Sequence, residues 1–416
     1  MYQEINKCRI CGNTELIPVL NLGSQALTGI FPETKERSVG TMPLVLVKCL
    51  DKDHADRCGL LQLKHTGNLT ELYGKDYGYR SGLNRSMVLH LHGKVKKILA
   101  QTRLTKDDLV IDIGSNDSSL LQAYPNEGLN LVGIDPTGVK FSKYYPAHIQ
   151  LIPDFFSAAK VQETFGNRKA KIVTSCSMFY DLEDPMAFMQ QVHDVLDEQG
   201  VWVFEQSYMP TMLERNSYDT VCHEHLEYYA LKQIQWMAER VGLKILDVEF
   251  NDINGGSFSV TVAKKGSATQ PNSARIKQIL QQEHELGLHT LKPYEEFKTR
   301  AYKQRDELLA FIRKASAEGK TVFGYGASTK GNVLLQFCGL SEKDLPCIAE
   351  VNPDKFGCFT PGTLIPITSE QEAKKMNPDY FLVLPWHFRD NILAREQEYR
   401  NNGGQFLFPL PHVEAV

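Results

Sequence analysis

At 416 residues the chain is too long for one ordinary domain, and its 42% hydrophobic and 23% charged residues are the proportions of a soluble globular protein. Its formal net charge of −4 provides no broad electropositive face, so nucleic acid is not an expected partner. The sequence has no run of 18 apolar residues and no signal-peptide pattern near its start, so we expect a cytoplasmic protein with no membrane partner.

Residues 1–72 are expected to form a small domain held together by a metal ion. Their short strand-like runs bury too little apolar surface to fold without one. The cysteines of this segment are Cys8, Cys11, Cys49 and Cys58. The spacing of the first two is compatible with tetrahedral zinc, and the other two would complete four sulfur ligands. The loop between the second pair contains His54, so a Cys3His site is also possible. No activating group stands nearby, which favours a structural role.

Residues 73–268 alternate apolar strands with amphipathic helices, the pattern of a doubly wound parallel sheet. One strand ends in Asp112, and a turn containing Gly114 leads into a helix. The next strand ends in Asp135-Pro136, where a carboxylate is placed to accept hydrogen bonds from a ribose diol. Only one glycine of a dinucleotide fingerprint is present. The pattern therefore indicates the cofactor site of a class I methyltransferase rather than an NAD site.

The segment VCHEHLEYY, residues 221–229, carries candidate acid–base chemistry. The metalloprotease motif His-Glu-x-x-His is excluded, because its second histidine would stand where the chain has Glu227. A histidine oriented by a carboxylate suits a general base near neutral pH. We therefore expect His225, with Glu224 beside it, to move a proton.

Residues 269–318 have the composition of a polar helical connector, and residues 319–416 that of a small Rossmann-like α/β domain. In GYGASTKGN, residues 324–332, glycines follow a strand and precede a helix, where they can expose backbone N–H groups to an anion. Lys330 adds a positive charge. The segment is not a Walker loop, and we expect it to give this domain a phosphate site of its own.

The order of paired cysteines, DIGSND, GIDPT, HEH, NGGS, GYGASTKGN, PGT and PW resembles the nucleotide-sugar C-methyltransferases, including C-3 methyltransferases of 4-keto deoxysugars. The resemblance runs nearly end to end. It implies an α/β architecture with a small N-terminal zinc-binding domain, a class I methyltransferase Rossmann-like domain and a C-terminal Rossmann-like domain. The sugar nucleotide would lie between the last two.

Residue roles follow from this resemblance, motif by motif. The zinc ligands would be Cys8, Cys11, Cys49 and Cys58. S-adenosylmethionine would be bound by Asp112, Gly114, Asn116, Asp117, Asp135, Pro136, Asp154, Phe155 and Phe156. The sugar nucleotide would contact Tyr79, Arg80, Asn254, Ser328, Lys330, Asn332 and Trp386. His225 would be the catalytic base, with Glu224, Asp181 and Tyr79 as further catalytic candidates.

The chain departs from these relatives at two positions. Relatives often have a tyrosine where this chain has Cys222, and a histidine where it has Asp181. The base His225 is kept, whereas groups that would stabilise an enolate or move protons differ. The identity of the sugar is left open by these differences.

The expected reaction is carbon methylation of a nucleotide-linked 4-keto-6-deoxy sugar, carried by dTDP, GDP or CDP. A ring C–H becomes a nucleophile only when an adjacent ketone lets its proton leave as an enolate, so His225 would remove the C-3 proton. One rival is an O- or N-methyltransferase, and another is a non-catalytic, zinc-bearing nucleotide-binding protein. A monomer and a small homo-oligomer are both compatible with the sequence.

Overall fold

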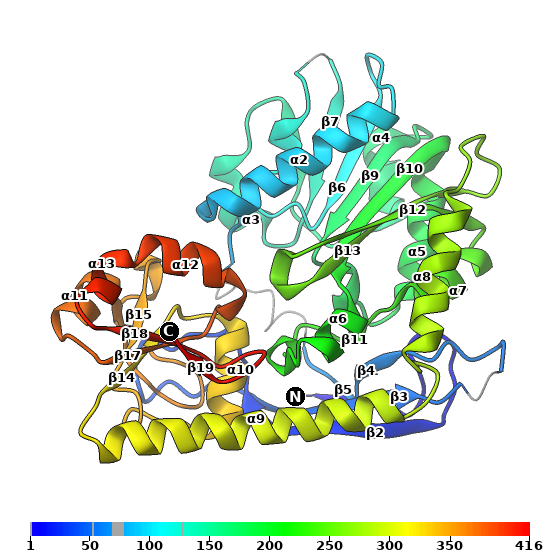
Figure 1. Cartoon of the computed structure of the whole chain (residues 1–416). Helices are drawn as coiled ribbons and strands as arrows, with labels where there is room; N and C mark the ends of the chain where they lie inside the picture. The colour runs from blue at the N-terminus through cyan, green and yellow to red at the C-terminus, as the bar shows by residue number, and fades with distance from the viewer. Residues whose placement is uncertain (1, 52–53, 69–78, 127) are drawn as a thin grey trace.

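The computed structural model describes residues 2–51, 54–68, 79–126 and 128–416, and its strands gather into separate sheets. Figure 1 shows the two α/β units side by side, with the N-terminal sheet and a long helix below them. The predicted boundary at residues 72 and 73 lies outside the described residues.

The N-terminal unit is a small antiparallel sheet whose apolar strands pack around leucine side chains such as Leu44, Leu46 and Leu61. Its strands are β2 (Leu16–Ala26), β3 (Thr41–Cys49) and β4 (Leu61–Leu63), beside the short pair β1 (Gln3–Glu4) and β5 (His65–Thr66). The fourth strand of the main sheet, β11 (Glu227–Tyr228), comes from the middle of the chain and pairs with β4. The N-terminal unit is thus completed by residues of the next one.

The central unit is a seven-stranded sheet of order β12-β13-β10-β9-β6-β7-β8, in which β13 runs antiparallel to its neighbours. The strands are β6 (Leu109–Ile113), β7 (Asn130–Ile134), β8 (Ile149–Ile152), β9 (Ala170–Cys176), β10 (Leu196–Ser207), β12 (Leu243–Asn251) and β13 (Ser257–Lys264). β6 is buried along its whole length, as expected for a parallel strand covered on both faces. The strand order reverses between β6 and β9, so the turn after β6 opens at a topological switch point, where such sheets bind ligands.

Helices cover both faces of this sheet, and their starts follow from local sequence. The helices of the unit are α2 (Arg85–Gln101), α3 (Gly138–Phe141), α4 (Ala158–Phe165), α5 (Pro185–Val195), α6 (Met209–Glu214), α7 (Leu231–Arg240) and α8 (Ser273–Glu285). The Asp184 side chain caps α5 by accepting from the Ala187 N–H, and Pro185 stands in the first turn, where its missing N–H costs nothing.

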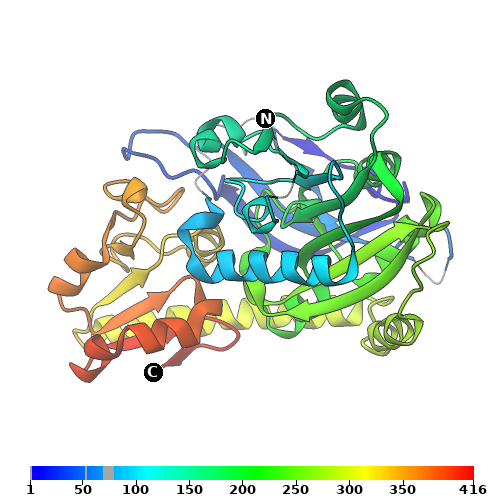
Figure 2. The ribbon, with the colours of Figure 1, turned by 90° about the horizontal axis from the view of Figure 1, so that it is seen from above.

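The predicted connector, residues 269–318, is helical but is not a free-standing spacer. Its first helix, α8, packs on β12 of the central sheet. Its second, α9 (Lys292–Ala317), buries apolar side chains such as Phe297 and Leu308, and it spans the molecule from β2 to the C-terminal unit (Figures 1 and 2). No described helix is both long enough and apolar enough to cross a membrane.

The C-terminal unit has the predicted Rossmann-like form, with sheet order β16-β15-β14-β17-β18-β19 and parallel pairing except at β19. Its strands are β14 (Val322–Tyr325), β15 (Ile348–Glu350), β16 (Ile367–Ser369), β17 (Tyr380–Val383), β18 (Gln405–Phe408) and β19 (Glu414–Ala415). Its helices are α10 (Thr329–Cys338), α11 (Glu370–Lys375), α12 (Arg389–Arg395) and α13 (Gln397–Asn401).

Candidate active site

The four N-terminal cysteines converge on one point. Their sulfurs all lie within 4.8 Å of one another, with 3.5 Å between Cys8 and Cys58 and 3.6 Å between Cys11 and Cys49. Four sulfurs at about 2.3 Å from a central zinc ion would be about 3.8 Å apart, so the donor set fits tetrahedral zinc. His54 is exposed and is not part of this group, which settles the choice between four cysteines and a Cys3His site.

The HEH segment is attached directly to this zinc-binding unit. It forms a turn that ends in β11, whose Glu227 and Tyr228 stand opposite Gln62 and Leu61 of β4. The Leu63 N–H donates to the Leu226 carbonyl at 2.8 Å and extends the ladder by one bond. The backbone on either side of the predicted base is therefore positioned by the sheet that the cysteines close.

The α7 helix strengthens this attachment just after β11. Its Gln233 side chain donates to the carbonyls of Cys58 and Gly59, at 3.0 and 3.1 Å. The Lys232 ammonium lies 2.6 Å from the buried carboxylate of Asp51. These contacts hold the zinc loop and the segment after the HEH motif together.

The turn after β6 has the features expected of the cofactor site. Gly114 has φ +73°, a left-handed conformation that favours glycine. Asp112 accepts from the Thr174 hydroxyl at 2.6 Å, and burial raises the pKa of its carboxyl group to about 7. At the end of β7, Asp135 accepts from the Asn116 N–H at 2.8 Å and from Thr137, and thereby holds the turn in shape. A glycine turn beside a buried acid at the carboxyl edge of the sheet fits a nucleoside cofactor.

Two predicted cofactor residues also hold the segment of residues 79–82 against the turn through hydrogen bonds. Asn116 accepts from the Ser81 N–H at 3.0 Å, and Asp117 accepts from the Gly82 N–H at 2.9 Å. Arg80 stacks on the Tyr144 ring at 4.3 Å and its guanidinium lies 3.7 Å from Asp117. Tyr79, which is partly exposed, bonds to Asn116 only through its backbone carbonyl. Tyr79 and Arg80, expected on the substrate side, thus lie against the cofactor turn.

The other predicted cofactor residues follow β7 and β8 at the same edge of the sheet. Pro136 begins the turn after β7, and Asp154 and Phe155 stand exposed after β8. Phe156 packs on Phe188 with ring centroids 5.3 Å apart, so it belongs in part to the core. Their contact with S-adenosylmethionine stays a prediction.

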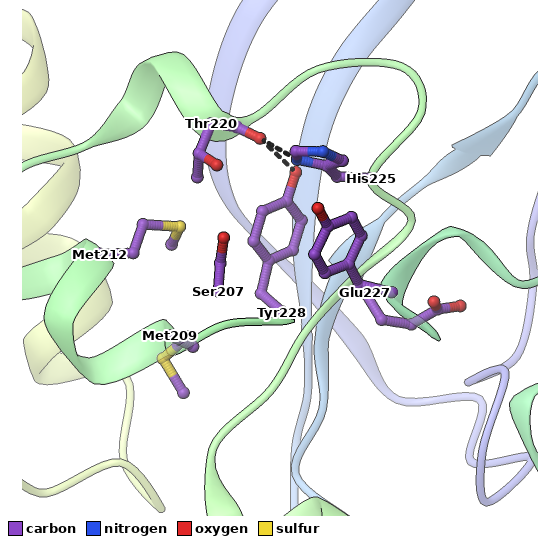
Figure 3. A pocket seen from close by; sticks show the side chains of 8 residues that line it. Ser207, Met209, Met212, Thr220, His225, Glu227 and Tyr228 are labelled. Atoms are coloured by element: carbon purple, nitrogen blue, oxygen red, sulfur yellow. Dashed lines mark hydrogen bonds between the residues drawn. The ribbon is translucent and has the colours of Figure 1, made fainter. Parts of the chain in front are cut away.

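His225 is held in one orientation by the backbone. Its Nδ1 lies 2.9 Å from the Thr220 carbonyl oxygen, so Nδ1–H donates and Nε2 keeps its lone pair. Its ring meets the Tyr180 ring edge-on at 4.3 Å, and both line a small cavity together with Glu227 and Tyr228 (Figure 3). Burial, and then the charge of Lys330, lowers the pKa of His225 to about 3, so the imidazole is neutral. A neutral ring with a free Nε2 is in the form that a general base requires.

The expected orientation of His225 by Glu224 is not what the structure shows. Glu224 faces the zinc-binding unit, where it accepts from the Thr28 hydroxyl at 3.4 Å. A methyl group on Gly29 would stand 2.5 Å from its Oε1, so only glycine leaves room for it. Burial raises the pKa of Glu224. Because neighbouring side chains leave the backbone in different directions, the carbonyl of Thr220, and not Glu224, orients the ring.

A short segment after β9 joins the cofactor turn to His225. Met178 lies against Gly114, with its Cγ 3.0 Å from where a side chain on that glycine would begin. Ser177 accepts from the Asn254 side chain at 3.4 Å, and the Tyr180 carbonyl accepts from the Leu226 N–H at 2.8 Å. Asp181 is the residue of this segment that the sequence predicts to take part in the reaction. The sequence signal for the whole segment is that MFYDLED directly follows a parallel strand, where residues lie at the ligand-binding edge of the sheet.

The C-terminal unit brings two predicted residues to the same place. Lys330 Nζ donates to the Asn254 carbonyl at 2.7 Å, and the Trp386 indole N–H donates to Asp219 at 2.8 Å. The other two predicted substrate residues of this unit make hydrogen bonds within the protein. Ser328 caps α10 by accepting from Gly331, and Asn332 donates to the Thr28 carbonyl at 2.8 Å.

The glycine turn after β14 has fewer free backbone N–H groups for binding an anion than its sequence suggests. Its Ala327 N–H already donates to Glu350 at 2.7 Å, which also places a carboxylate beside the turn. Side chains on Gly326 or Gly331 would meet Pro385 at 2.7 Å or Leu384 at 2.6 Å. Close packing against the segment after β17 therefore accounts for these two glycines.

We expect about one zinc ion per purified chain. Cys11→Ser should lower metal content and the free energy of unfolding by on the order of 3 kcal/mol, because zinc binding contributes directly to folding. Elemental analysis and denaturant titration measure the two effects. Cys358→Ser, a half-buried cysteine outside the cluster, is the matched control and should change neither. A zinc-free protein of unchanged stability would contradict the assignment.

Asp135→Ala should weaken S-adenosylmethionine binding by about 1–3 kcal/mol, because hydrogen-bonding groups at this buried position would lose their partner. Isothermal titration calorimetry provides the affinity. Asp197→Ala is the control. Asp197 lies at the amino end of β10, away from the carboxyl edge of the sheet where Asp135 stands, and its variant should bind like the wild type. Equal affinities of wild type and Asp135→Ala would place the cofactor elsewhere.

Three family comparisons match successive parts of the chain. They are a zinc binding domain over residues 8–73, a methyltransferase domain over residues 87–248 and a C-methyltransferase C-terminal domain over residues 252–411. These matches agree with the cysteine cluster, the cofactor turn and the C-terminal sheet described above.

One relative resembles the chain over nearly its whole length. The chain is 31% identical to C-methyltransferase NovU of Streptomyces niveus, over 99% of this chain and 97% of that protein. Solved structures with likeness include a methyltransferase of Haloferax volcanii in complex with the Trm112 activator (13% identity, 44% of this chain, 94% of that chain, TM-score 0.37). Another is an S-adenosylmethionine-dependent methyltransferase from Clostridium acetobutylicum (14%, 42%, 92%, 0.33). The near full-length match shows that this chain belongs to the C-methyltransferase family, with S-adenosylmethionine as its methyl donor and a four-cysteine site for structural zinc.

Proposed function

We propose that the protein methylates C-3 of a nucleotide-linked 4-keto-6-deoxy sugar through an enolate. The observation that carries the proposal is His225, a neutral imidazole whose Nδ1–H is committed to the Thr220 carbonyl. Carbon methylation needs a base to expose the nucleophile, and Nε2 of this ring is free to take a proton.

The arrangement of the chain supports proton removal close to the cofactor turn. Residues 177–181 contact Gly114 at one end and carry the Tyr180 ring against His225 at the other. When bound, S-adenosylmethionine supplies an electrophilic methyl group. The task of the protein is then to hold the sugar carbon between the turn and His225, where positioning accounts for much of the rate.

The nucleotide of the substrate is proposed to lie toward the C-terminal unit. This unit is separate from the cofactor turn, yet it contributes Lys330 and Trp386 to the region around His225. We propose dTDP, GDP or CDP as the carrier.

The reaction can be tested directly. Wild-type protein and S-adenosylmethionine are incubated with dTDP-, GDP- and CDP-linked 4-keto-6-deoxyhexoses, and products are analysed by mass spectrometry and NMR. A mass gain of one methylene with the new methyl carbon bonded to C-3 is the expected result. Methyl transfer to an oxygen or nitrogen would contradict the proposal.

His225→Ala should lower turnover by roughly 10²- to 10⁴-fold, the usual contribution of a positioned base. Binding of S-adenosylmethionine should stay within a few-fold of the wild type, because the cofactor turn lies on other strands. Exchange of the C-3 proton in D2O, measured by NMR without cofactor, should be lost together with methylation. His148→Ala, an exposed histidine before β8, is the matched control and should behave like the wild type.

Two further variants separate the candidate bases. Asp181→Asn tests the residue that stands where relatives often have histidine, and Glu224→Gln tests the neighbour of His225. Because Glu224 faces Thr28, its variant should retain proton exchange. Exchange that survives in His225→Ala and disappears in Asp181→Asn would make Asp181 the base.

A further inference from the structure

The ammonium group of Lys330 crosses from the C-terminal unit into the central one. Lys330 lies in the first turn of α10, and its Nζ donates to the Asn254 carbonyl at 2.7 Å. Asn254 has φ +55° in the turn before β13, and its side chain reaches Ser177 after β9. The lysine charge is thus fixed beside the segment that joins the cofactor turn to His225.

The surroundings of Lys330 are buried and polar, with unused hydrogen-bonding capacity. Asp219 accepts from Trp386 through Oδ2, whereas its buried Oδ1 has no hydrogen-bond partner in the described chain. His387 Nδ1 is likewise buried and unpartnered among the described residues. Gly255 lies against both Trp386 and His387, which joins these groups to Asn254. Buried polar atoms of this kind are typical of a place that receives a polar ligand or water.

Lys330 acts electrostatically on both histidines of this region. Burial is the main cause that lowers the pKa of His225 and of His387, each to about 3, and the charge of Lys330 adds to it in both cases. Tyr180 of the 177–181 segment and Glu227 and Tyr228 of β11 line the small cavity with His225, and the Cys222 carbonyl accepts from the His225 N–H at 3.2 Å. The charged group that acts on the pKa of His225 is Lys330 of α10.

A role for Lys330 in phosphate binding at its own helix is less well supported. Its side chain points to Asn254 rather than back over the glycine turn. The Ala327 and Gly331 N–H groups of that turn are already bonded, and the Glu350 carboxylate lies 2.7 Å from the Ala327 nitrogen and would repel a phosphate. Lys330 instead extends into the central unit, where its charge acts on His225.

We infer that Lys330 is a catalytic residue that stabilises the negative charge developing on the ketone oxygen while His225 removes the neighbouring carbon-bound proton. This inference rests on the proposed function and deepens it. In the step, the C-3–H bond breaks and its proton goes to Nε2 of His225. The bonding pair forms a C-3–C-4 double bond, and the carbonyl π pair moves to the oxygen, which the Lys330 ammonium holds. No oxidant, reductant or metal enters the balance.

The arrangement also restricts the substrate class. A cation for the oxygen and a neutral base for the adjacent carbon work together only on a ketone, because an alcohol has no π pair to release onto its oxygen. We therefore expect 4-keto sugar nucleotides to undergo exchange and the corresponding 4-hydroxy sugar nucleotides to be inert.

The test is the rate of C-3 proton exchange of dTDP-4-keto-6-deoxyglucose in D2O, followed by NMR without S-adenosylmethionine. Lys330→Met should lower the maximal exchange rate by about 10²- to 10³-fold, the effect of removing one oxyanion donor, with KM changed less than about threefold. Lys330→Arg should recover part of the rate. Lys355→Met removes another half-buried lysine of the same unit and is the control, which should exchange like the wild type.

The pH profile gives a second readout, which reports whether the Lys330 charge acts at His225. Neutral His225 is the proposed active form, and its lowered pKa predicts that the wild type stays active well below pH 6. Loss of the Lys330 charge removes the smaller of the two causes that lower this pKa and should raise it, so the acid limb of the Lys330→Met profile should shift to higher pH. An unshifted limb would contradict the inference.

The outcomes distinguish the inference from the function on which it rests. If the wild type neither exchanges nor methylates any keto sugar nucleotide, the proposed function fails. If the wild type exchanges and folded Lys330→Met exchanges equally fast, only the inference fails. If Lys330→Met keeps the maximal rate but raises KM strongly and weakens binding of dTDP alone, Lys330 binds phosphate instead. Circular dichroism and thermal unfolding establish that the variants are folded.

Discussion

The pairing of β11 with β4 is the contact on which the candidate active site depends. The cysteine cluster closes the loop that leads into β4, β4 pairs with β11, and β11 follows His225 after a single intervening residue. Strand pairing fixes the register of two backbones through their hydrogen bonds. Because zinc binding stabilises the folded N-terminal sheet, it also stabilises the position of the segment that carries the proposed base His225. A structural zinc site thereby positions the loop of the proposed base His225, which is distant from the cysteines in sequence.

The consequence is a site shared by three units rather than contained in one. The zinc-binding unit contributes Thr28 and Gly29, the central sheet contributes the cofactor turn and the 177–181 segment, and the C-terminal unit contributes Lys330. Several polar atoms of residues 206–229 are buried without a hydrogen-bond partner in the described chain. Burial of this kind is costly for folding, but it keeps His225 neutral and strengthens the effect of a nearby charge.

Much of the architecture followed from local sequence. The period of the apolar residues predicted a doubly wound sheet, and the acids at the ends of β6 and β7 predicted the cofactor turn, because parallel strands bring their carboxyl ends to one edge. The cysteine spacing predicted the metal site. The structure excludes His54 from it, because that side chain is exposed and does not belong to the group of four cysteines. The expectation that Glu224 orients His225 was wrong, since adjacency along the chain does not place two side chains face to face.

The sequence by itself determined which residues could bind zinc, cradle a nucleoside and accept a proton, because these properties depend on side-chain chemistry and short spacing. Only the tertiary structure decided that Thr220 orients His225, that Tyr180 packs on its ring, and that Lys330 of the C-terminal sheet unit reaches Asn254 beside the central sheet. His387, which no motif indicated, joined the same region through the fold. Such contacts arise from the packing of separate sheets, and no local pattern encodes the distance between residues from different sheets.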